Sequence, residues 1–212
     1  MRVIGKKYPF LFLLLPLLLL FACSKNLNDT NSIETPAEKV TSQIDSATGD
    51  KYFISKYPNG NIEEEGWFKA GGKSGYWKRY YENSVLKEGG HYLSGLKNDW
   101  WEEFNEQGVK IYEGSYQKGT RNGFSTYYFD NGKISKQGNY TKDKKDNWWV
   151  EYDSNGFMIN AGYYSNGARD GYSETYKMGI IESEGMYQNN IKTGFWKYYD
   201  KTGKLKRIEE YD

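Results

Sequence analysis

The 212-residue sequence contains only one cysteine and one histidine. A single cysteine excludes an intrachain disulfide, so the chain must fold without that constraint even if it is exported. His91, the only histidine, stands beside a glycine in a predicted strand. We interpret its side chain as solvent-facing. No serine or cysteine has a histidine partner that the pattern would supply, which removes the usual nucleophile–base pair.

Motifs for metals and nucleotides are missing as well. Residues 71–74 read GGKS, as at the end of a phosphate loop, but Trp67 stands where that loop requires a glycine. Asp143, Asp146 and Asp170 follow no calcium-loop spacing. We therefore expect a protein that is not an enzyme, with no catalytic, cofactor-binding or metal-ligating residues.

Neither sign of charge is in excess, since the chain has 29 basic and 28 acidic residues. Removal of residues 1–22 would take away Arg2, Lys6 and Lys7 and no acid, leaving 26 basic and 28 acidic residues. Such a balance provides no electrostatic attraction to nucleic acid, so no nucleic-acid partner is expected.

The chain has one long apolar run, at residues 8–22, which follows three basic residues and ends at Cys23. It is too short and wrongly flanked for a membrane span, and it is typical of a secretory signal peptide. The segment Leu20-Phe21-Ala22-Cys23 resembles a bacterial lipoprotein lipobox. That resemblance implies cleavage before Cys23 and lipidation of its thiol. A plain cleaved signal followed by a chance cysteine is the alternative.

Residues 23–50 are predicted to be a lipidated flexible linker, because they are rich in Ser, Thr, Asn and acids and contain no aromatic residue. The chain would then be anchored to a membrane through the lipid on Cys23. Ser24 and Lys25 carry no acidic signal for retention at the inner membrane, so the outer membrane is preferred. The remainder, residues 51–212, is predicted to be one repeat domain.

A 24-residue repeat organises this domain. Glycine recurs at residues 66, 90, 114, 138 and 162, and Gly185 follows one residue early, because the fifth unit is one residue shorter. We number the residues of each unit from its glycine as position 1. Positions 3, 11 and 15 are then aromatic in all six units; position 11, for example, is Tyr76, Trp100, Phe124, Trp148, Tyr172 and Phe195.

Turn residues divide each unit into two extended segments. Positions 6, 10 and 19 are glycine or, with few exceptions, Asn or Asp, the residues that tolerate a positive φ. We therefore predict left-handed backbone there and two strands per unit, one from about position 20 to position 4 of the next unit and one over positions 11–16. The expected fold is all-β: an elongated single antiparallel meander of about six stacked hairpins. Lys51–Lys56 and residues 204–210 are candidate caps at its two ends.

Side-chain alternation along a strand predicts which residues form the core. Positions 3, 11 and 15, with aliphatic residues at position 21, are expected to share one buried face. Position 12 has the opposite parity to position 11, so its tryptophans would face away from this ladder. They are therefore the candidate partner-binding residues, although they could instead pack locally on Lys and Arg stems: Trp77, Trp101, Trp149 and Trp196.

The repeat resembles the MORN repeat in its bacterial variant. The match is clearest from Gly114-x-Tyr116-x-x-Gly119-x-x-x-Gly123 through Tyr127-Tyr128 to residues 131–134, and it covers about residues 57–212. The resemblance implies a MORN-type repeat array. Similar bacterial proteins form an antitoxin-like set, the YwqK family, whose label implies neutralisation of a toxin by binding. MORN arrays elsewhere are implied to be scaffolds, dimerisers or lipid-associated modules.

Two functions are consistent with these features. The first is a non-enzymatic, membrane-anchored envelope lipoprotein whose array binds a protein or a glycan such as peptidoglycan. The second is an antitoxin-like immunity protein that neutralises a toxin.

Overall fold

The computed structural model describes residues 41–44, 48–70 and 72–212. The chain divides into two units, Met1–Thr35 and Pro36–Asp212, and every described residue belongs to the second. The predicted signal peptide and Cys23 lie outside the described residues.

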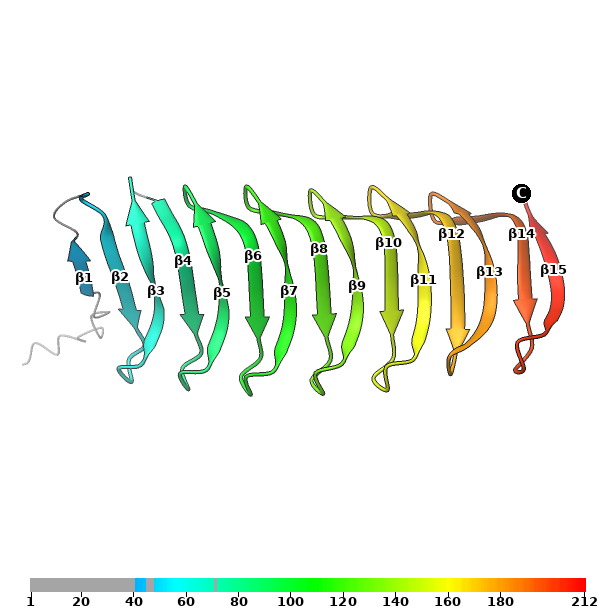
Figure 1. The fold of residues 1–212 in the computed structure, drawn as a ribbon, viewed down its shortest axis with the longest axis horizontal. Coiled ribbons are helices and arrows are strands. Elements are labelled where there is room, and N and C mark those ends of the chain that lie inside the picture. Colours follow the sequence, from blue (N-terminus) through cyan, green and yellow to red (C-terminus); the bar gives the residue numbers. More distant parts are fainter. Residues whose placement is uncertain (1–40, 45–47, 71) are drawn as a thin grey trace, which may run out of the picture. The chain divides into compact units, whose positions relative to one another are not determined.

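The described residues form strands and turns (Figure 1). The strands are β1 (Thr41–Ile44), β2 (Lys51–Lys56), β3 (Ile62–Lys69), β4 (Gly72–Tyr80), β5 (Leu86–Leu93), β6 (Leu96–Phe104), β7 (Lys110–Gln117), β8 (Thr120–Tyr128), β9 (Ile134–Thr141), β10 (Lys144–Tyr152), β11 (Met158–Ser165), β12 (Ala168–Lys177), β13 (Ile180–Gln188), β14 (Ile191–Tyr199) and β15 (Leu205–Tyr211). Within the part of the chain that is described, there is no helix long and apolar enough to cross a membrane.

All of these strands belong to one antiparallel sheet, in which each strand pairs with its neighbours in sequence. The order runs from β1 to β15 without a crossover, so the predicted all-β meander is confirmed. The six predicted units are β3 to β14, and the sheet extends beyond them at both ends. β1 and β2 form a pair before the first unit, with β1 inside the segment predicted to be a linker, and β15 follows the sixth unit.

The predicted left-handed turn positions are confirmed in the described residues. At one end of the hairpins the chain turns through two residues of positive φ, as at Lys118 (50°) and Gly119 (86°). Two-residue turns with positive φ at both residues have the same twist as the strands they join, so they are favoured in β-hairpins. At the other end, a glycine at position 19 such as Gly132 has a φ of 78° and donates its backbone N–H to the carbonyl of Phe129. Position 10 is also left-handed in every unit, with Gly123 at 111°.

A bulge at position 10 sets the register between the two strands of a unit. Glu65 pairs with Lys78, but the next pair is Trp67 with Ser74, so three residues of β4 lie opposite Gly66 alone. This extra backbone contains Gly75, whose φ is 71°. Extra residues on one strand change which face of the sheet the following side chains point to. The face of a residue in the second strand of a unit therefore cannot be predicted by counting residues from the first strand through the turn.

The register corrects the predicted core. Trp77 lies directly opposite Gly90, so position 12 shares a face with position 1 and therefore with position 3. We call this the tryptophan face. Positions 11, 15 and 21 share the other face, as expected for these three: Tyr80 pairs with Leu86, and its hydroxyl reaches Glu65 on that face. The prediction that positions 3, 11 and 15 form one buried ladder is wrong.

Candidate functional site

The four candidate binding tryptophans are the most buried large side chains of the sheet. Trp77, Trp101, Trp149 and Trp196 expose 1–2% of their surface. The prediction that they face away from the core is therefore wrong, and they do not present a surface to a partner. The physical cause is the glycine at position 1: a Cβ on Gly90 would come within 2.4 Å of the Trp101 ring, so only glycine lets the ring lie on the backbone.

Each indole is also held by a hydrogen bond at the bulge. The Trp101 Nε1–H donates to the backbone carbonyl of His91 at 3.0 Å, and Trp149 donates to that of Asn139 at 2.8 Å. Neighbouring tyrosines at position 3 meet the indoles edge-on, with 5.0 Å between the ring centroids of Tyr92 and Trp101. A buried ring with its one polar atom satisfied is a stable core element.

A basic residue at position 8 covers each site on the tryptophan face. The six are Lys73, Lys97, Arg121, Lys145, Arg169 and Lys192. The Lys97 ammonium lies 4.0 Å from the Trp101 ring centroid and 2.8 Å from a carboxylate oxygen of Glu88. The predicted local packing of tryptophan on a basic stem is therefore found, although the stems come from position 8.

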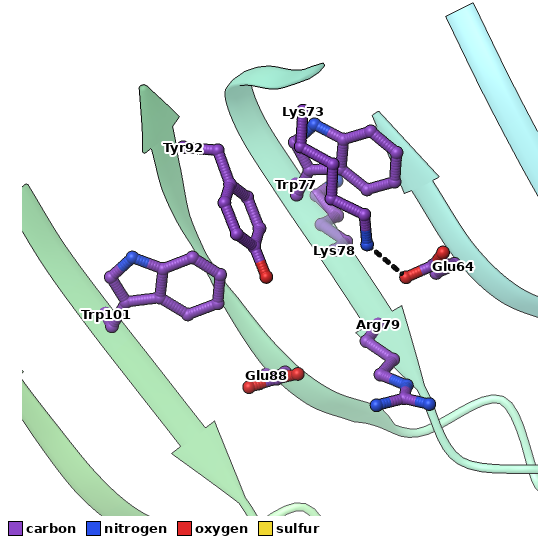
Figure 2. Close-up of a pocket in the computed structure, with 8 residues that line it drawn as sticks. All are labelled: Glu64, Lys73, Trp77, Lys78, Arg79, Glu88, Tyr92 and Trp101. Atoms are coloured by element: carbon purple, nitrogen blue, oxygen red, sulfur yellow. Dashed lines mark hydrogen bonds and ion pairs between the residues drawn. The ribbon is translucent and has the colours of Figure 1, made fainter. Parts of the chain in front are cut away.

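The hollow between the first two units shows how little room this arrangement leaves (Figure 2). Lys73 extends across the Trp77 ring to Glu64, and Tyr92 stands between Trp77 and Trp101. The cavity measures about 60 Å³. Pockets that enclose a drug-sized ligand measure about 300–1,000 Å³, so this hollow is not a small-molecule site.

The opposite face carries the exposed aromatic side chains. We call its position-11 residues the outer aromatic row: Tyr76, Trp100, Phe124, Trp148, Tyr172 and Phe195. Trp100 is 42% exposed and Phe195 is 65% exposed, whereas Trp148 and Tyr172 are half-buried. Position 2 adds further rings beside them, since Trp148 meets Tyr163 at 4.8 Å between ring centroids. Exposed apolar side chains on neighbouring strands form a contiguous patch, which is typical of an interaction surface.

Tyrosine–glutamate hydrogen bonds fix the rest of this face. The Tyr199 hydroxyl donates to Glu184 at 2.6 Å, and Tyr172 and Lys197 donate to the same carboxylate. Burial raises the pKa of Glu184, but these donors outweigh it and lower the pKa to about 2. Burial and the hydrogen bond to Glu113 raise the pKa of Tyr128 to about 12. The exposed rings therefore stand on an ordered, charged framework.

Residues considered for catalysis and metal binding are dispersed over the sheet. His91 packs edge-on against Tyr76 at 5.3 Å, as a side chain of the outer face. Asp143 is engaged by Arg121 at 3.0 Å, and Asp146 accepts a hydrogen bond from Thr141. Within residues 41–44, 48–70 and 72–212, no group of three or more His, Cys, Asp or Glu side chains could hold a metal ion.

Comparison with known proteins gives no assignment: no family model matches the sequence, and no curated protein matches it. The site must therefore be judged on its geometry. Sequence reasoning missed the exposure of the outer aromatic row because it assigned position 11 to the core. The signal that could have corrected it is position 12 itself, which holds only tryptophan or the small residue serine, at Ser125 and Ser173, whereas position 11 takes any aromatic residue.

Proposed function

We propose that this chain is a non-enzymatic envelope lipoprotein, anchored through Cys23, whose MORN-type array binds a protein partner through the outer aromatic row. The observation that carries the proposal is the exposure of aromatic rings on one face in units along the array: Trp67, Tyr76, Trp100, Phe124, Tyr163 and Phe195. Large, stiff aromatic side chains lose little conformational entropy when a partner covers them, and they are the usual anchors of protein interfaces.

A glycan is the second candidate ligand, because flat exposed rings at regular intervals can stack on sugar faces. Position-11 residues recur on every second strand, roughly 10 Å apart at the usual strand spacing. Carboxylates lie beside the rings on the same face, such as Glu174, which accepts from Tyr172, and Glu102, which accepts from Lys110. They would accept hydrogen bonds from sugar hydroxyls.

The test uses a photo-crosslinking residue at Phe124, in the middle of the row, in cells that produce the full-length protein. We expect a discrete crosslinked species that is lost when Trp100 and Phe195 are both changed to alanine. The same crosslinker at Lys142, on an exposed turn, is the control. Co-sedimentation with purified peptidoglycan that depends on Trp100 would favour the glycan, and crosslinking to a toxin would favour the antitoxin-like alternative. Equal crosslinking at positions 124 and 142 would contradict the proposal.

Lipidation is tested separately. Metabolic labelling with palmitate should mark the protein and should be lost in the Cys23→Ala variant. Label that survives this substitution would exclude Cys23 as the anchor.

A further inference from the structure

Glutamates stand directly opposite each other at two places on the outer face. Glu102 pairs with Glu113 between β6 and β7, and Glu174 pairs with Glu184 between β12 and β13. The two pairs are equivalent in the repeat, because each joins position 13 of one unit to the residue before the next glycine. Like charges directly opposite each other destabilise a sheet, so each pair needs a compensating cation.

A lysine compensates the first pair. Lys110 binds Glu102 at 2.5 Å and Glu113 at 2.9 Å. The residue that corresponds to Lys110 in the second pair, again three before the glutamate next to the glycine, is Ile181. Lys110 and Ile181 also hold the same place in the register, since each pairs with the position-15 residue of the preceding strand. The second pair therefore lacks the cation that the first pair has.

Tyrosine hydroxyls and one exposed lysine surround the second pair instead. Glu174 accepts from Tyr172 at 3.0 Å and from Tyr176 at 2.6 Å, and within the described part of the chain it forms no ion pair. The Tyr172 hydroxyl also contacts Glu184, but its single hydrogen can be donated to only one of the two carboxylates. Lys197 binds Glu184 at 2.8 Å. The pair thus keeps uncompensated negative charge on the outer face.

Exposed apolar side chains lie beside this charge. Met186, Phe195 and Ile208 are exposed on the neighbouring strands β13, β14 and β15 of the same face. Phe195 lies directly opposite Glu210, an exposed acid that forms no ion pair with any residue the structure describes. An apolar patch with an excess of one sign of charge is complementary to a partner surface of the opposite charge.

From this arrangement we propose that the outer face from β12 to β15 docks a basic surface of a protein partner, with a lysine or arginine of that partner bound at Glu174 and Glu184. The inference rests on the proposed function and specifies the chemistry of the partner. Lys110 shows how a cation fits such a pair, since its one ammonium reaches both carboxylates. A neutral glycan would leave the charge uncompensated, so the basic protein is favoured.

The apolar neighbours suit the same occupant. Lysine and arginine carry long apolar stems, which Met186 and the Phe195 ring would cover while the charged end reaches the carboxylates. An arginine can in addition bind a carboxylate through two parallel hydrogen bonds, and it can lie over an aromatic ring. Both contacts require the partner's side chain to enter between β12 and β14.

A photo-crosslinking residue at Met186, in cells that produce the full-length protein, tests this inference. We expect a crosslinked protein whose attached peptide, identified by mass spectrometry, lies in a segment rich in lysine and arginine. Glu174→Gln should lower the crosslink yield about tenfold or more, as expected for the loss of a hydrogen bond to a charged group. Glu102→Gln is the matched control, because Lys110 already neutralises that pair, and it should leave the yield unchanged.

The sharpest variant is Ile181→Lys, which places a lysine where Lys110 stands in the earlier pair. It should abolish the crosslink at position 186 without lowering the urea unfolding midpoint, because the internal lysine replaces that of the partner. A crosslink at position 124 combined with none at position 186, or with a yield at 186 that neither variant changes, would overturn this inference and leave the proposed function standing. No crosslink at either position contradicts both. Attachment at 186 to an acidic segment, a glycan or a second copy of this chain also overturns the inference.

Discussion

The indole of Trp101 lies flat on Gly90, at a distance that leaves no room for a Cβ on that residue. The same contact joins Trp77 to Gly66, Trp149 to Gly138 and Trp196 to Gly185. The 24-residue spacing of glycine is therefore a packing requirement as well as a mark of regularity.

Gly90→Ala should destabilise the array. The added methyl group would lie 2.4 Å from the Trp101 ring, and the overpacking should lower the free energy of unfolding by about 1–3 kcal/mol. Urea unfolding of Gly90→Ala, Trp101→Ala and the double variant gives the coupling between the two sites. The double variant should be more stable than the sum of the single effects allows, because removal of the ring removes the clash. Strict additivity would show that the methyl group and the ring do not meet.

A substitution in the short turn of the fifth unit should increase the stability of the protein. Met178 has a φ of 52° and precedes Gly179 in a two-residue turn between β12 and β13. Asparagine tolerates this conformation better than methionine does, so Met178→Asn should raise the free energy of unfolding by about 1 kcal/mol. The reverse change at the equivalent left-handed residue Asn189, whose φ is 49°, should lower it. Thermal midpoints of both variants test the pair, and a lower midpoint for Met178→Asn would contradict it.

Glu184 should make stability dependent on acid pH. Its pKa lies near 2 in the folded chain and near its ordinary value of 4.5 when unfolded. A depressed pKa contributes stability that is present above pH 4.5 and is lost as the pH falls towards 2. The Glu184→Gln variant should therefore lose stability at neutral pH and show a flatter profile between these two values. Urea midpoints across this range, compared with the native chain, test the assignment, and parallel profiles would refute it.

Much of the fold follows from residue types alone. Glycine, Asn and Asp at positions 6, 10 and 19 predict the left-handed turns, and the aromatic segments between them predict the strands. The relations within a strand were also right: position 1 with position 3, and position 11 with position 15. Each of these depends on local backbone geometry, which a short sequence segment determines.

Local residue types could not predict which positions of the first strand of a unit share a face with which positions of the second strand. Counting residues from Gly90 to Trp101 passes through a two-residue turn and the bulge at Asp99, and each changes which face the next side chain meets. The two faces also look alike in sequence, because both carry aromatic residues. Glycine decides between them, since position 12, unlike position 11, repeatedly has a glycine opposite it on the neighbouring strand.

The central claim is that position 12 holds the fold and position 11 is free to bind, and the adjacent residues Trp101 and Trp100 test it most directly. They share a residue type and a strand, but one is 1% exposed and the other 42%. Urea unfolding should show a loss of about 3–5 kcal/mol for Trp101→Ala, as for other large core truncations, and about 1 kcal/mol or less for Trp100→Ala. Equal losses, or a larger loss for Trp100→Ala, would contradict the account.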